Sequence, residues 1–156
     1  MKTILTFYLV LELSILSLSV KQRSQEVLYQ FRNGDGIELI ISNIRKKTGI
    51  IKIGMYNSDK GFPHNPAVSF SLAKDTISSG ILRFFIPIEK PGSFSFSILD
   101  DENSNGKMDY FLRIIPKEGF GFSNNPKISG KAPQFSETSF YFSGGLMKVL
   151  VKMVYI

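Results

Sequence analysis

The chain has 156 residues, a formal net charge of +6 at pH 7 and no cysteine. This length is enough for one ordinary domain and too short for two. The lack of cysteine excludes a disulfide framework and any metal site built on thiolates. Hydrophobic residues make up 43% of the sequence and include 14 phenylalanines, which predicts a folded domain with an aromatic-rich core.

The first residues have the pattern of a targeting segment. Lys2 is followed by an almost unbroken apolar run over residues 3–18, and Ser17 and Ser19 are small residues of the kind found before a cleavage site. Glu12 argues against a membrane-spanning helix, because an acidic residue at a helix centre costs about 2.5–3.5 kcal/mol. We therefore predict a signal peptide over residues 1–19 and a secreted or periplasmic protein of the cell envelope, without a stable membrane span.

The positive charge is spread along the chain, and Arg45-Lys46-Lys47 is the only basic run. Scattered basic residues are typical of a solvated surface, whereas nucleic-acid binding usually needs a concentrated basic patch. An exported protein also has little access to nucleic acid, so no nucleic-acid partner is expected.

Residues 20–36 are mixed in character and predict a linker or a loosely attached first strand over Val27–Phe31, ending in a turn at residues 33–36. From Ile37 onward, apolar and polar residues alternate as they do in half-buried strands. Residues 37–42 and 51–55 both show this alternation, and the polar residues 45–49 separate them. This arrangement predicts a hairpin of two strands.

The rest of the chain continues the same pattern. Residues 57–66 hold a glycine and two prolines and predict a long loop. Further strands are predicted over residues 68–72, 81–88, 93–99, 138–142 and 147–155. About seven short strands without an amphipathic helix predict an all-β fold, with residues 37–156 forming a single antiparallel β-sandwich.

Two consecutive motifs carry a family resemblance: D-E-N-S-N-G-K-M-D over residues 101–109 and I-P-K-E-G-F-G-F-S-N-N over residues 115–125. Together with the first predicted strands they resemble domain-of-unknown-function family 2141, a group of uncharacterised secreted bacterial proteins. The resemblance covers residues 37–155 and implies a signal peptide followed by one transthyretin-like or immunoglobulin-like sandwich. Asp100 stands where many members have a histidine, and Tyr110-Phe111 replace polar residues.

The first motif matches the front half of a calcium-binding loop. Side-chain oxygens would come from positions 1, 3, 5 and 9 and a backbone carbonyl from position 7. In this chain those ligands are Asp101, Asn103, Asn105, Asp109 and the carbonyl of Lys107.

The bidentate glutamate of position 12 is missing, because Leu112 stands there. Asp100, Glu118 or water would have to complete the shell, which predicts weak binding at ~10⁻⁴–10⁻³ M. Asn, Asp, Ser and Gly also build tight turns without a metal, so a metal-free turn stays an open alternative.

The second motif allows two interpretations as well. The glycines around Phe120 permit a bent backbone, and the rings of Phe120 and Phe122 would clamp this loop onto the domain. Alternatively, Glu118, Phe120, Phe122 and Asn124 form a ligand-binding surface, because rigid scaffolds often carry binding residues on loops.

These observations favour an exported, non-catalytic binding or structural module of the cell envelope, whose partner is an envelope protein or a glycan. The alternative is a carbohydrate-binding or adhesion module, although the chain has no tryptophan. A hydrolase is less favoured: its paired carboxylates would lie in one loop, and the only histidine, His64, lies in a proline-rich loop. We predict no catalytic residues, and no cofactor other than calcium.

Overall fold

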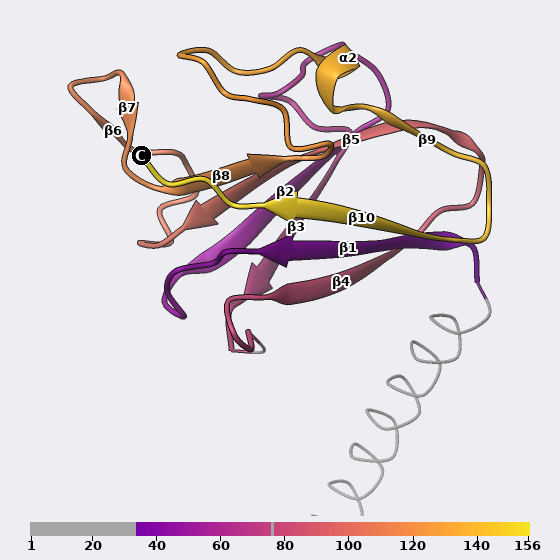
Figure 1. The fold of residues 1–156 in the computed structure, drawn as a ribbon, viewed down its shortest axis with the longest axis horizontal. Helices are drawn as coiled ribbons and strands as arrows, with labels where there is room; N and C mark the ends of the chain where they lie inside the picture. The colour runs from indigo at the N-terminus through magenta and orange to yellow at the C-terminus, as the bar shows by residue number, and fades with distance from the viewer. Residues whose placement is uncertain (1–33, 76) are drawn as a thin grey trace, which may run out of the picture. The chain divides into compact units, whose positions relative to one another are not determined.

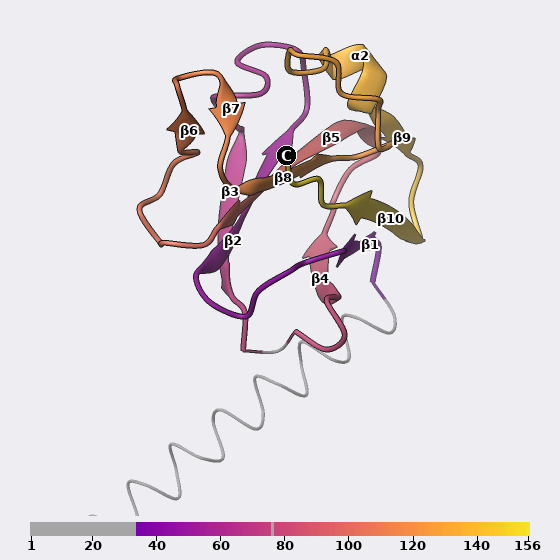
Figure 2. The same ribbon diagram turned by 60° about the vertical axis from the view of Figure 1, so that its left-hand side comes forward.

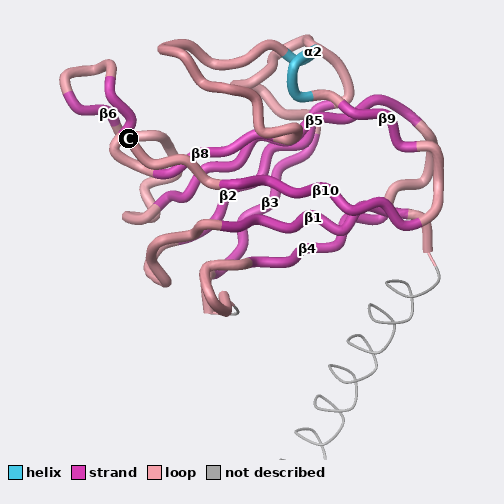
Figure 3. The backbone as a smooth tube through the Cα atoms, viewed as in Figure 1, coloured by secondary structure: helices cyan, strands magenta, loops and turns pink. Residues whose placement is uncertain are grey.

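The computed structural model describes residues 34–75 and 77–156, and nearly all of their regular structure is β (Figure 1). The strands are β1 (Gly36–Ser42), β2 (Ile50–Tyr56), β3 (Val68–Ala73), β4 (Leu82–Pro87), β5 (Gly92–Asp101), β6 (Tyr110–Phe111), β7 (Ile115–Pro116), β8 (Gly119–Phe122), β9 (Phe140–Phe142) and β10 (Leu146–Lys152). One short helix, α2 (Phe135–Thr138), interrupts them (Figure 3). The predicted all-β fold is confirmed. The predicted signal peptide and the strand at 27–31 lie outside the described residues.

The strands form two larger sheets and one small hairpin. The first sheet has the order β10-β1-β4, and the second has the order β3-β2-β5-β8, with β9 paired to the other end of β5. Strands β6 and β7 pair only with each other. Within the described residues, no helix is long and apolar enough to cross a membrane.

One hydrophobic core draws on both larger sheets. Its buried side chains alternate along the strands, as the sequence pattern predicts. They include Ile37, Leu39 and Ile41 of β1, Ile51 and Ile53 of β2, Leu82 and Ile86 of β4, Phe96 and Ile98 of β5, and Val149 and Val151 of β10. Burial of this apolar surface supplies the main favourable free energy of folding.

The predicted hairpin of the first two strands is wrong. β1 pairs in parallel with β10 and antiparallel with β4, whereas β2 lies in the other sheet between β3 and β5. The connection carries the chain from one sheet to the other, with Ile44 buried in the core and Asn43 at a φ of 64°. Alternation identifies the buried face of a strand but not the strand that lies next to it. The prediction of a purely antiparallel arrangement is also wrong, because β1 and β10 are parallel.

Three of the ten strands in the described residues, β6, β7 and β8, fall where a loop was predicted, because they are only two to four residues long and lie among glycines and a proline. The strand predicted over 138–142 begins as helix α2 and becomes β9 only at Phe140. The N-cap residue of this helix is Gln134, whose backbone N–H donates to Glu137 Oε2 at 2.6 Å. The carboxylate of Glu137 thereby satisfies one of the unpaired donors of the first helical turn.

Candidate functional site

The segment over residues 102–118 leaves the second sheet at the end of β5 and returns to it at the start of β8. Asp100 pairs with Gly119 of β8 and with Ile51 of β2, so both ends of the segment meet at one place. The acidic loop (residues 101–109) begins at the last residue of β5, and the β6–β7 hairpin (residues 110–116) follows it. Both predicted motifs therefore lie at one end of the second sheet.

Asp101 organises the acidic loop from a fully buried position. Its Oδ1 accepts the backbone N–H of Asn105 at 3.0 Å, and its Oδ2 accepts that of Gly106 at 2.8 Å. A buried carboxylate needs such partners because removing it from water is costly. The glycine has a φ of +86°, a conformation that L side chains rarely adopt. The aspartate and the glycine of the pattern D-x-[DN]-x-[DN]-G therefore both shape this turn.

The remaining predicted ligands face one another across the loop. Asp109 Oδ2 accepts the side-chain amide of Asn103 at 2.7 Å and that of Asn105 at 2.8 Å. The amide oxygens accept backbone N–H groups two residues further on, at Asn105 and Lys107. The structure therefore brings Asn103 and Asn105 together around Asp109, and Asp101 joins this network through the backbone N–H of Asn105.

Calcium binding stays a prediction. The described residues contain no group of three or more His, Cys, Asp or Glu side chains able to hold a metal ion. That search does not test the predicted site, whose ligands are two carboxylates, two amides and a backbone carbonyl. Asp100, considered above as an extra ligand, is buried next to Lys74 instead.

Glu118 ties the two ends of the acidic loop together and is only 4% exposed. Its Oε1 accepts the backbone N–H of Glu102 at 3.0 Å, and its Oε2 accepts that of Asp109 at 3.2 Å. The backbone N–H of Lys117 in turn donates to the carbonyl of Asp109 at 2.9 Å. Glu118 therefore stabilises the loop from inside.

Beneath the acidic loop lies a buried charge cluster formed by Lys74, Asp100 and Tyr155. The side chains of Lys74 and Asp100 are both 0% exposed, and Lys74 Nζ contacts Asp100 Oδ1. The hydroxyl of Tyr155 donates to Asp100 Oδ2 at 2.6 Å. Burial and the neighbouring carboxylate raise the pKa of Tyr155, so this hydroxyl keeps its proton.

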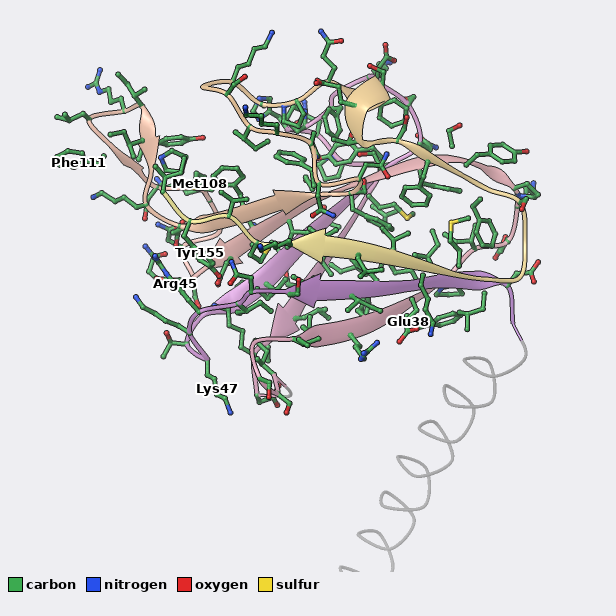
Figure 4. All side chains as sticks on the ribbon, in the orientation of Figure 1. Glu38, Arg45, Lys47, Met108, Phe111 and Tyr155 are labelled. Carbon is green, nitrogen blue, oxygen red and sulfur yellow. The ribbon has the colours of Figure 1, made fainter. Side chains whose placement is uncertain are left out.

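Arg45 lies beside Tyr155 (Figure 4) and forms an ion pair with Glu102 at 2.6 Å. The Arg45 guanidinium lies 4.3 Å from the ring centre of Tyr155 and donates to both carboxylate oxygens of Glu102. Lys46 adds a second ion pair to Glu102 at 2.8 Å. These hydrogen bonds, chiefly the one from Arg45, lower the pKa of Glu102 to about 2.

The β6–β7 hairpin carries large apolar side chains into solvent. Exposed fractions are 54% for Phe111, 73% for Leu112 and 78% for Ile114, and Tyr110 and Ile115 are also exposed. The turn residues Leu112 and Arg113 have φ values of 51° and 62°, and the backbone N–H of Ile114 donates to the carbonyl of Phe111 at 3.1 Å, which closes a β-turn. Figure 1 and Figure 2 both show this hairpin standing away from the two larger sheets.

The predicted binding surface of the second motif is mostly covered. Glu118 is buried, Phe120 and Phe122 are half-buried, and only Asn124 is exposed. Gly119 and Gly121 face the other way: an added Cβ would meet the ring of Tyr155 at the first position and Val151 at the second. The G-F-G-F sequence therefore lets β8 pack closely on the end of the chain, and a binding role for these four residues stays a prediction.

Sequence reasoning missed two groups of buried polar residues. Ser95, Ser123 and Thr138 bond to one another, with 2.7 Å between the hydroxyls of Ser95 and Thr138. Ser95 alternates with Phe94 and Phe96 in the sequence, a pattern that predicts the polar face of the strand, but it is 0% exposed. Lys74 was missed because it follows a strand in an ordinary polar turn, and nothing in the local pattern indicates its burial beside Asp100.

The protein is an all-β domain in which buried carboxylates hold a loop at one end of the second sheet. The chain matches the family described as "Uncharacterized protein conserved in bacteria (DUF2141)" over residues 39–149. It belongs to this family, and the resemblance seen in the sequence is confirmed. Comparison with curated proteins and with solved structures gave no match.

We predict that Glu102→Gln lowers the free energy of unfolding near pH 7 by about 1 kcal/mol, the scale of a partly exposed ion pair. Since folding lowers the pKa of Glu102, its contribution is complete above the ordinary value near 4.5 and is lost as the pH falls toward 2. Chemical unfolding of both proteins from pH 7 to pH 2 measures this: the difference between them should vanish at the acid end. Glu89→Gln, at an exposed position, is the control; a Glu102→Gln difference that stays constant with pH contradicts the assignment.

Proposed function

We propose that this protein is an exported, non-catalytic β-sandwich module that docks on the cell envelope by placing its β6–β7 hairpin in an anionic membrane surface. The observation that carries this proposal is the row of exposed apolar side chains along the hairpin, Tyr110, Phe111, Leu112, Ile114 and Ile115. Soluble domains rarely expose so many neighbouring large apolar residues unless the surface has a binding role.

The charges beside the hairpin favour a lipid surface with negative headgroups. Lys107, Arg113 and Lys117 lie before, within and after the apolar residues in the sequence and are exposed, and in the described part of the chain none of their side chains forms an ion pair. Of the acidic residues at its base, Glu102 forms ion pairs with Arg45 and Lys46, and the carboxylates of Glu118 and Asp109 accept hydrogen bonds from neutral amide groups. Basic residues around an apolar tip are attracted to anionic lipid while the tip enters the interface.

The base of the hairpin is well anchored, which suits a docking element. The carbonyl of Asp109 accepts the backbone N–H of Lys117, and Glu118 fixes the residue before the hairpin at Asp109. An ordered hairpin loses little conformational entropy when it binds, and this lowers the free-energy cost of docking.

A carbohydrate-binding role is the second candidate. An open hollow of about 670 Å³ is lined by Phe62 and Phe135 together with Asp59, Gln134 and Ser136. Aromatic rings with neighbouring polar groups suit a sugar, whose ring has apolar faces and hydroxyl edges. Phe62 and Phe135 pack edge-to-face against each other at 5.9 Å, however, and this contact already occupies part of their surface.

We predict that the purified chain sediments with vesicles containing phosphatidylglycerol and that binding weakens as salt is raised. The double variant Phe111→Ser/Ile114→Ser should lose at least about tenfold in affinity, since burying a large apolar side chain contributes about 1.5–3 kcal/mol and 1.4 kcal/mol corresponds to tenfold. Arg113→Gln should weaken binding less, and mainly at low salt.

The matched control is Leu146→Ser/Leu150→Ser, which removes two exposed leucines of β10, far along the chain from the hairpin. Its vesicle binding should equal that of the wild type. Unchanged binding in the hairpin variant, or equal loss in the β10 variant, contradicts the membrane proposal. Binding to a glycan array that survives the hairpin substitutions would favour the carbohydrate-binding role instead.

We also propose that calcium stabilises the acidic loop. In support, the oxygens of Asp101, Asn103, Asn105 and Asp109 are already gathered on one short loop. Rotation of the two amides would present their oxygens toward Asp109, the carboxylate that their N–H groups now contact. Two carboxylates with few further ligands favour weak affinity, ~10⁻⁴–10⁻³ M.

Millimolar calcium should therefore raise the melting temperature of the wild-type chain by a few degrees, since a ligand that binds only the folded state stabilises it. Asp109→Asn should abolish this shift, because it removes one of the two carboxylates of the predicted calcium site. The replaced carboxylate is half-buried and contacts only the side-chain amides of Asn103 and Asn105. Asp59→Asn, at an exposed acidic residue outside the loop, should keep it. Equal shifts in all three proteins, or none in the wild type, count against calcium binding.

A further inference from the structure

We propose that Lys74 and Asp100 react with each other to form an intramolecular isopeptide bond that cross-links the second sheet. The inference starts from the buried charge cluster. The amine of Lys74 contacts the carboxylate of Asp100 directly, and both side chains are 0% exposed. Neither side chain takes part in the membrane docking proposed above.

The surroundings of the pair favour reaction over a simple ion pair. Among the described residues, Lys74 Nζ and Asp100 Oδ1 make no hydrogen bond beyond their mutual contact. A buried ammonium and carboxylate are stable only when further hydrogen bonds satisfy the rest of each group. Condensation to an amide removes both charges from the protein interior.

The chemistry is a balanced condensation that needs no oxidant or reductant. One proton moves from the Lys74 ammonium to the Asp100 carboxylate, which gives an amine and a carboxylic acid. The amine nitrogen attacks Cγ of Asp100, and a C–N bond forms. The C–O bond to Oδ1 then breaks, and Oδ1 leaves as water with its own proton and one from the nitrogen. The products are one amide and one water molecule.

Tyr155 is placed to assist this reaction. Its hydroxyl donates to Asp100 Oδ2 at 2.6 Å, the oxygen that stays on Cγ and carries the developing negative charge. A hydrogen-bond donor at that position stabilises a tetrahedral intermediate more than the starting acid. The backbone N–H of Arg45 donates to the Tyr155 oxygen at 3.2 Å and fixes its orientation. Tyr155 is thus assigned as a catalytic residue of the cross-linking step.

The bond would join segments that are not neighbours in the sheet. Lys74 directly follows β3, and Asp100 lies near the end of β5; β2 lies between these two strands. A cross-link across β2 would hold the edge strand β3 to the centre of its sheet. In a chain without cysteine, an amide gives the constraint on the unfolded state that a disulfide gives elsewhere.

The test is a tryptic digest of the denatured wild-type chain, analysed by tandem mass spectrometry. Trypsin cannot cleave after an acylated lysine, so the proposal predicts a branched product that joins residues 61–83 to residues 84–107 and is lighter than their sum by one water. Quantitative cleavage after Lys74, giving separate peptides 61–74 and 75–83, overturns the proposal. This measurement needs no substitution and therefore does not depend on whether a variant folds.

Two variants then test the assigned roles. Lys74→Met removes the amine, keeps an apolar stem and should give only unbranched peptides. Tyr155→Phe keeps the ring over Gly119 but loses the hydroxyl. Its branched product should form at least about tenfold more slowly than that of the wild type, because removing one hydrogen-bond donor to a developing oxyanion slows a reaction by at least this much. A wild-type rate in Tyr155→Phe contradicts the role of Tyr155, and a branched 61–83/84–107 product in Lys74→Met contradicts Lys74 as the nucleophile.

Discussion

The loop end of this domain depends on how three buried carboxylates are satisfied. Asp100, Asp101 and Glu118 are all at most 4% exposed, and each would be costly without partners. Asp100 contacts Lys74 and accepts the hydroxyl of Tyr155, Asp101 accepts the N–H groups of Asn105 and Gly106, and Glu118 accepts those of Glu102 and Asp109. The path of residues 101–118 follows from these contacts.

The same contacts link the core to the surface that we propose for docking. Asp100 lies at the end of β5, whose earlier residues Phe96 and Ile98 belong to the hydrophobic core. Glu118 and Asp109 fix the base of the β6–β7 hairpin, and the apolar tip projects beyond it. A rigid core thus holds an apolar hairpin in a defined position, the usual division between scaffold and binding loop.

Much of this architecture could be predicted from the sequence. Alternation correctly placed most longer strands and their buried faces, and the D-x-N-x-N-G pattern correctly indicated a tight loop around Asp101. Strand partners could not be predicted, because alternation is the same whether β1 pairs with β2 or with β10. The burial of Lys74 depends on a partner 26 positions away in a different strand, and no local pattern contains that information.

The exposure of the hairpin could not be predicted either, for a related reason. Tyr110, Phe111, Leu112, Ile114 and Ile115 would be taken for core residues by composition alone. Only the three-dimensional structure shows that they form a two-stranded hairpin that no other part of the described residues 34–75 and 77–156 buries. The predicted surface around Phe120 was based on the same kind of composition, and there the structure places half-buried rings and a buried Glu118.

Amide hydrogen exchange in a Glu118→Gln variant tests the central claim most directly. An amide side chain has one acceptor oxygen in place of two, so it cannot accept from Glu102 and Asp109 with separate oxygens. The account predicts clearly faster exchange across residues 102–118, with protection in β1 unchanged. Equal protection of residues 102–118 in variant and wild type would contradict the claim that buried carboxylates hold this end of the domain.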